Sequence, residues 1–145
     1  MRYIVDANVI FPVIAAGHAH HRPAVAWWDA CADDDVGLCW PVRMALLRLL
    51  TNRKIMGSGV LRPEQAWSAV ETIASDPRMV LIDQAPQSHH ERWRTYVGGR
   101  EPSPDLWTDA WLAALAHSLD TKMVTFDRGF LSFDALRLQL LTPTT

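Results

Sequence analysis

Three aspartates stand where they could hold a metal ion or act on a phosphate. Asp6 follows the short apolar run 3–5, Asp127 follows the run 122–126, and Asp109 lies near the start of the Ala- and Leu-rich segment 107–119. Runs of β-branched and aromatic residues predict buried strands, and ligands of open α/β sheets bind at the carboxyl ends of the strands. We therefore expect Asp6 and Asp127 at one sheet edge, with Asp109 nearby on the helix before the second strand.

Three carboxylates that converge at one edge would repel one another unless a positive group lay between them. A hard divalent cation with oxygen ligands, Mg²⁺ or Mn²⁺, is the simplest such group, and it could activate water and stabilise charge on a phosphate being cleaved. Each acid also has a purely structural interpretation. Asp6 could cap a helix with Asn8, Asp109 could favour a helix start, and Asp127 could sit in a turn.

The elements that must position these residues alternate along the chain. Apolar runs predict strands at 3–5, 37–40, 79–82, 122–126 and 136–141, of which 79–82 is the clearest buried strand. Helical spacing predicts helices at 9–16, 22–32, 41–50, 63–74, 86–97 and 107–119, with a turn-rich loop at 51–59. This alternation predicts an α/β fold with a mostly parallel sheet.

Composition sets outer limits on the function. The chain has 145 residues, 49% of them hydrophobic and 21% charged, with a net charge of −2, which indicates one globular domain over 1–145 and excludes a generally basic nucleic-acid coat. No apolar stretch of roughly 18 residues occurs, so no membrane span is expected, and Asp6 and Asn8 argue against a signal peptide. Cys31 and Cys39 match no zinc spacing and are expected to be reduced, as in a cytoplasmic protein.

Three short motifs together resemble those of PIN domains, most closely the VapC-like toxins of bacterial toxin–antitoxin pairs. They are residues 4–9 around Asp6, residues 108–116 around Asp109 and residues 124–130 around Asp127. The resemblance implies a three-layer α/β/α sandwich and an Mg²⁺- or Mn²⁺-dependent ribonuclease in which water attacks an RNA phosphodiester. It also implies a homodimer and a small VapB-like antitoxin whose C-terminal segment wraps the active site.

Carried over onto this sequence, the resemblance assigns the metal to Asp6, Asp109 and Asp127, with Asp105 as a further candidate ligand. Asn8, beside the first acid, and Thr125, in the third motif, are supporting residues. The chain departs from the family where PIN nucleases usually carry a glutamate, which we place at Arg43, or at Met44 if the register slips by one. Arg43 could contact RNA phosphate or pair with Asp6 or Asp109, and the departure leaves a two-metal mechanism in question.

Other residues allow both a functional and a structural interpretation. The basic residues that could contact the RNA backbone, or simply form a solvated face, are Arg48, Arg53, Lys54 and Arg128. We expect most of the seven tryptophans in the core and some at a dimer or antitoxin interface. His18, His20 and His21 are expected in a polar loop rather than a metal site, and His89 and His90 on the solvent side of a helix.

Two other function classes compete with the nuclease. A degenerate PIN domain would bind RNA or a protein without cutting, as the absent glutamate suggests. A phosphatase of the haloacid dehalogenase type also places an aspartate after its first strand. That chemistry needs a second aspartate where this chain has Asn8, and it needs a catalytic lysine, although only Lys54 and Lys122 exist.

Overall fold

A parallel five-stranded sheet forms the centre of the molecule. The computed structural model describes residues 1–143, and its strands are β1 (Tyr3–Val5), β2 (Val36–Cys39), β3 (Met79–Ile82), β4 (Lys122–Thr125) and β5 (Leu138–Leu140). Their order across the sheet is β3-β2-β1-β4-β5, and every neighbouring pair is parallel. The predicted α/β class is therefore confirmed, with strand boundaries that differ by two residues at most.

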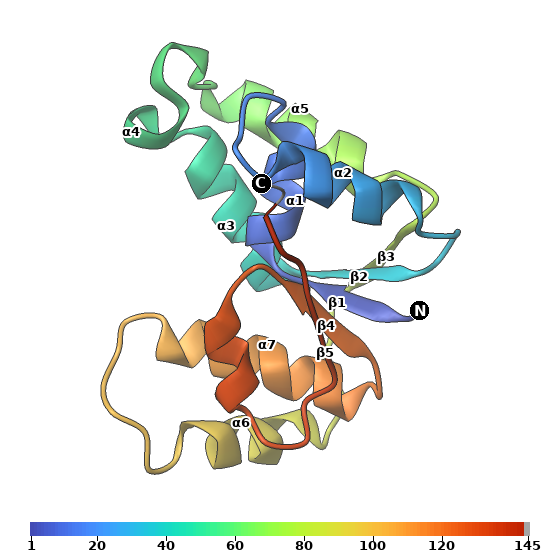
Figure 1. Ribbon diagram of the computed structural model, residues 1–145, viewed down its shortest axis with the longest axis vertical. Helices are drawn as coiled ribbons and strands as arrows, with labels where there is room; N and C mark the ends of the chain where they lie inside the picture. The colour runs from blue at the N-terminus through green and yellow to red at the C-terminus, as the bar shows by residue number, and fades with distance from the viewer. Residues whose placement is uncertain (144–145) are drawn as a thin grey trace.

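Helices cover both faces of this sheet, which gives the three layers that the motifs implied (Figure 1). One face carries α1 (Ala7–Ile14), α2 (His21–Asp29), α3 (Trp40–Leu50) and α5 (Pro63–Ala74), and the other carries α6 (His89–Val97) and α7 (Leu106–Ser118). The chain changes faces between β3 and β4. The point where the strand order reverses therefore lies between β1 and β4, which is where ligands bind in such sheets.

The register of β1 against β4 determines which residues emerge together at this point. Val5 pairs with Val124, and the backbone N–H of Asp6 donates to the carbonyl of Val124 at 3.0 Å. The two strands run in the same direction, so the residues that follow them leave the sheet at the same edge. Asp6 and the segment Thr125–Asp127 are thus neighbours, although about 120 positions separate them in the sequence.

Helix α7 is buried on most of its surface, because small residues let it approach the sheet closely. Its buried residues are Ala110, Leu112, Ala113, Ala114, Leu115 and Ala116. It contacts β1, β4 and α6, which places its first turn near the edge where Asp6 emerges. The packing of α7 therefore positions Asp109 as well as supporting the core.

Three expectations about the remaining elements were wrong. Strand β3 is an edge strand, and Leu81 is 44% exposed, because only β2 pairs with β3. The segment 51–59 is not simply a loop. It contains the short helix α4 (Arg53–Met56), whose N-cap Asn52 accepts a hydrogen bond from the Lys54 backbone, and a 3-10 turn, η1 (Gly57–Gly59). His89 is buried, and its Nε2 lies 2.9 Å from the carbonyl oxygen of Trp111.

Cys31 and Cys39 are both free thiols, as expected. Within residues 1–143, no helix combines the length and apolar character needed to cross a membrane.

The burial of α7 makes a clear stability prediction. Leu115→Ala should lower the free energy of unfolding by about 2–5 kcal/mol, because Leu115 is fully buried and its truncation leaves a cavity. Leu131→Ala is the matched control. Leu131 is 59% exposed, so its truncation should change stability by less than about 0.5 kcal/mol. Urea unfolding followed by tryptophan fluorescence measures both, and equal effects of the two substitutions would contradict the packing described.

Candidate functional site

Thr125 connects the polar residues at the β1–β4 edge. Its buried hydroxyl donates to Asp6 Oδ2 at 2.8 Å and accepts from Asn8 Nδ2 at 3.1 Å and from the Asp127 backbone N–H at 3.0 Å. Asn8 Oδ1 in turn accepts from the Phe126 backbone N–H at 3.2 Å. One side chain at the end of β4 therefore orients both residues of the first motif.

The hydrogen bonds of Asp6 and Asp127 agree with the structural interpretation for one acid and not for the other. Asp6 occupies the N-cap position of α1, but its side chain caps no helical N–H and accepts from Thr125 instead. Asp127 does form a turn, with Oδ1 accepting from the Gly129 N–H at 2.8 Å. A Cβ on residue 129 would lie 3.0 Å from that oxygen, a contact that would require the Asp127 side chain to shift slightly. Asp127 Oδ2 is left free of this turn.

Asp109 and Asp105 reach the same place from α7. Asp109 lies in the first turn of the helix and Asp105 is its N-cap residue, with the Asp109 N–H donating to the Asp105 carbonyl at 3.0 Å. Neither side chain forms an ion pair within residues 1–143.

These acids border one open cleft of about 690 Å³. The cleft is lined by four acids and an amide, namely Asp6, Asn8, Asp105, Asp109 and Asp127. Its other lining residues are Ala7, Phe11, His18, His20, Leu49, Ile55 and Phe126. The histidine loop between the first two helices thus reaches the cleft, which the sequence did not predict.

Burial and mutual repulsion raise the pKa values of two of the carboxylates. The pKa of Asp6 is raised to about 6, first by burial and then by the charge of Asp127, against the hydrogen bond from Thr125, which lowers it. The pKa of Asp109 is raised to about 7, first by burial and then by the charges of Asp6, Asp127 and Asp105. The acids therefore raise one another's pKa values, and none of Asp6, Asp109 and Asp127 forms an ion pair within the part of the chain that the structure describes.

The side-chain oxygens at this cleft are the ligand type that a hard divalent cation prefers. They are carboxylate and amide oxygens, which Mg²⁺ and Mn²⁺ prefer, and they carry uncompensated negative charge. In the described part of the chain, no three His, Cys, Asp or Glu side chains stand close enough together to hold a metal ion as they lie. The acids therefore line the cleft without forming a closed ligand cage as they lie.

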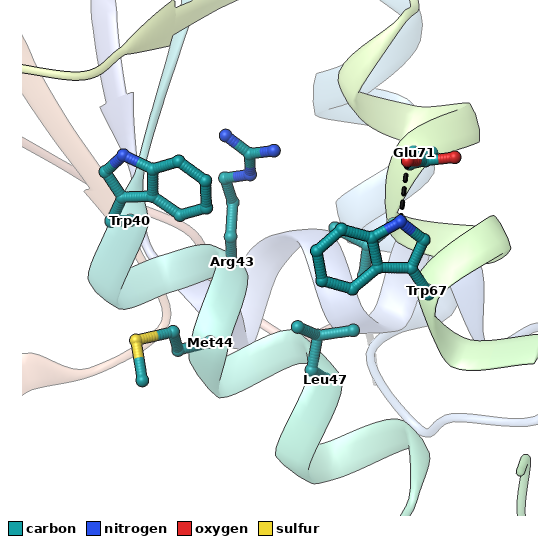
Figure 2. A pocket seen from close by; sticks show the side chains of 7 residues that line it. Trp40, Arg43, Met44, Leu47, Trp67 and Glu71 are labelled. Atoms are coloured by element: carbon teal, nitrogen blue, oxygen red, sulfur yellow. Dashed lines mark hydrogen bonds between the residues drawn. The ribbon is translucent and has the colours of Figure 1, made fainter. Parts of the chain in front are cut away.

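Arg43 lies away from this cleft. Its guanidinium stacks on Trp40, with Cζ 3.9 Å from the ring centroid, and it forms no ion pair with Asp6 or Asp109 within residues 1–143. Figure 2 shows it in a groove between α3 and α5 that Trp40, Trp67 and Met44 also line. Of the two roles suggested for Arg43, the pairing with Asp6 or Asp109 is thus wrong, and a contact with RNA phosphate stays a prediction. Leu49 is the α3 residue that lines the cleft, and Ala45 lies one turn before it on the same helix face.

The tryptophans divide between the core and the surface. Trp27 and Trp28 belong to the core, and Trp93 and Trp111 are partly buried against it. The other three, Trp40, Trp67 and Trp107, are 46%, 53% and 59% exposed. The basic candidates are all exposed and lie beside cleft-lining residues in the sequence. Arg48 precedes Leu49, Arg53 and Lys54 precede Ile55, and Arg128 follows Asp127.

The raised pKa values predict how stability depends on pH when no metal is present. A carboxyl whose pKa is higher in the folded than in the unfolded state takes up a proton on folding. The stability that this proton uptake contributes is therefore fully present below about pH 4. It is lost as the pH rises through about 6 for Asp6 and about 7 for Asp109. Asp109→Asn carries no charge at any pH. In EDTA its melting temperature should exceed that of the wild type by a few °C at pH 8 and match it near pH 4.

The control for this measurement is Asp33→Asn, because Asp33 is exposed in a turn before β2, away from the cleft. It should leave the melting temperature unchanged across the range. A melting temperature of Asp109→Asn at or below that of the wild type at pH 8 would contradict the electrostatic description.

Comparison with known proteins agrees with this geometry. The family model described as "PIN domain" matches residues 3–136. Ribonuclease VapC41 of Mycobacterium tuberculosis is 34% identical over 142 residues, which cover 95% of this chain and 97% of the relative. Ribonuclease VapC31 of the same species is 32% identical over 137 residues, covering 93% and 95%.

Solved structures share the fold at lower sequence identity. VapBC2 from Rickettsia felis, bound to a DNA fragment from its promoter, superposes with a TM-score of 0.67 at 16% identity and covers 98% of this chain and 100% of that one. VapC20 of Mycobacterium tuberculosis, described as a Sarcin-Ricin loop cleaving toxin, gives 0.66 at 20% identity, covering 93% and 98%. The chain therefore belongs to the PIN-domain family and, within it, to the VapC proteins.

Proposed function

We propose that this protein is a metal-dependent endoribonuclease, the toxin of a toxin–antitoxin pair. The observation that carries the proposal is the group of three carboxylates, Asp6, Asp109 and Asp127, around one cleft at the point where the strand order reverses. Relatives that span nearly the whole chain are named ribonucleases, which supports RNA as the substrate.

In this proposal the three aspartates hold Mg²⁺ or Mn²⁺ through their carboxylate oxygens, with Asp105 at the rim. When bound, such a cation supplies positive charge that offsets the acids and stabilises the negative charge of a phosphodiester undergoing hydrolysis. Thr125 keeps Asp6 oriented through its 2.8 Å hydrogen bond, and Asn8 fixes the chain after β4. Arg48, Arg53, Lys54 and Arg128 would contact the RNA backbone on either side of the cleft.

Free cysteines agree with the cytoplasm as the place of action, where RNA substrates are found.

The proposal is tested by RNA cleavage. Wild-type protein should cut total tRNA or rRNA into discrete fragments with Mg²⁺ or Mn²⁺ and should stop in EDTA. Asp109→Asn should lose more than about a hundredfold of this activity, because the substitution removes a ligand charge. Asp33→Asn should cut like the wild type. Cleavage retained by both Asp6→Asn and Asp109→Asn in preparations free of contaminating nuclease would overturn the proposal.

A second candidate function is RNA or protein binding without cleavage. It is favoured by one feature, the arrangement of the described acids, of which no three stand at metal-holding distance. Arg43 and Met44, where the sequence places the family's missing glutamate, both line the groove with Trp40. For this function we expect specific RNA binding. In the cleavage assay we expect no difference in fragments between wild type, Asp109→Asn and samples with EDTA.

We further propose that the protein forms a homodimer and binds a VapB-like antitoxin. Relatives of the same fold have been solved as VapBC complexes, and exposed tryptophans are frequent at the centres of protein interfaces. The face between α3 and α5 suits the dimer contact, since Trp40, Met44 and Trp67 expose their apolar surfaces there (Figure 2).

The dimer prediction compares two tryptophans of similar exposure. Trp67→Asp should convert the dimer to a monomer, because it places a charge in the apolar groove, whereas Trp107→Asp on α7 should leave the dimer intact. Light scattering after size exclusion measures the mass of each. A monomer from Trp107→Asp but not from Trp67→Asp would assign the contact to α7 instead.

A further inference from the structure

Four aromatic side chains that contact one another line the acidic cleft. Phe11 comes from α1, His18 and His20 come from the connection between α1 and α2, and Phe126 comes from the end of β4. We call this set the aromatic wall. All four residues line the cleft that Asp6, Asp109 and Asp127 also line, so the wall and the acids face the same space.

The rings of the aromatic wall contact one another in sequence. His20 is stacked on Phe126 with centroids 4.5 Å apart and an interplanar angle of 27°. His18 lies 5.3 Å from His20, and Phe11 meets His18 edge-on at 5.5 Å. The His18 Nδ1 accepts a hydrogen bond from the His20 backbone N–H at 2.9 Å, which holds the loop in this shape. Ring contacts and a backbone hydrogen bond therefore hold the aromatic wall together.

Core packing explains only part of this wall. Phe11 is 4% exposed and belongs to the core, and Phe126 packs against that core. Phe126, His18 and His20 are nevertheless only half-buried and line the cleft. Histidine is also an unusual choice for covering a core, since its ring nitrogens need polar partners. A stacked pair of flat rings that faces solvent is the kind of surface on which unpaired nucleobases stack.

The rest of the cleft agrees with a single nucleic-acid strand. Leu49 and Ile55 add apolar surface, and Arg53 and Lys54, exposed on α4 just before Ile55, supply positive charge for a backbone. Bases that are paired within an A-form duplex already stack on their neighbours, and side chains cannot insert between them without unstacking. The wall can accept a base only from a strand, loop or bulge where that base is free.

We propose that the aromatic wall is a base-binding subsite, in which an unpaired nucleobase beside the phosphate at the acids extends the stack of His20 on Phe126. In this subsite His20 is the positioning residue that holds the base beside the acids. This inference rests on the proposed nuclease function, because it identifies the substrate of the same cleft.

The experiment measures stacking apart from cleavage. Wild-type protein in EDTA is mixed with a short single-stranded RNA that carries one 2-aminopurine, a fluorescent base whose emission falls when it stacks on an aromatic ring. We expect quenching on binding to the single strand, and weaker binding without quenching for the same RNA annealed to its complement. His20→Ala should abolish the quenching and weaken single-strand binding about tenfold.

Two further variants keep the result interpretable. His20→Phe preserves a flat ring and should restore the quenching, with an affinity within about twofold of the wild type, because stacking needs only a π face. His90→Ala changes an exposed histidine on α6 and should have no effect. Melting temperatures of all variants show whether each is folded.

The outcomes separate this inference from the proposed function. Equal quenching and affinity in His20→Ala and wild type, or equal binding of single strand and duplex, would overturn the subsite even if wild-type protein cuts RNA. Quenching that depends on His20 in a protein that cuts no RNA under any metal condition would support the subsite while rejecting the nuclease.

Discussion

The parallel pairing of β1 with β4 is the constraint on which the site depends. Val5 and Val124 are partners in neighbouring strands, so the chain leaves both strands at one edge of the sheet. This brings Asp6, Asn8 and Asp127 next to one another, and the Thr125 hydroxyl forms hydrogen bonds to all three residues. Helix α7 is packed against the same two strands and brings Asp109 to the same edge from the other face of the sheet.

This arrangement is electrostatically costly for the folded protein. Burial and like charge together raise the pKa values of Asp6 and Asp109 to about 6 and about 7. The hydrogen bond from Thr125 offsets only part of this for Asp6. Acids with perturbed pKa values in a cleft, here at the edge of the sheet where ligands bind, are typical of functional sites.

The cleft brings carboxylates together with aromatic and apolar side chains from several elements. Arg43 does not line this cleft. It stacks on Trp40 in a separate groove between α3 and α5, so it adds no positive charge beside the acids (Figure 2).

Local sequence patterns predicted much of this protein. Apolar runs ending in aspartate identified β1 and β4, and the Pro–Glu start and apolar spacing of 63–74 gave the bounds of α5 as the structure has them. These features are set by short-range chemistry, namely β-propensity, capping and periodicity, so they can be recognised without the rest of the chain. The three motifs likewise carried the family membership, because their order and spacing survive in the linear sequence.

Only the tertiary structure decided what lies beside what. The run 79–82 is as apolar as a central strand, but its place at the sheet edge leaves Leu81 exposed, and no local pattern encodes edge position. The histidine loop reaches the acids because α1 and α2 pack together and return it to the β4 end, where His20 meets Phe126. Sequence thus determined the types of residue and the elements that carry them, whereas long-range packing determined which faces stay open and which side chains share the cleft.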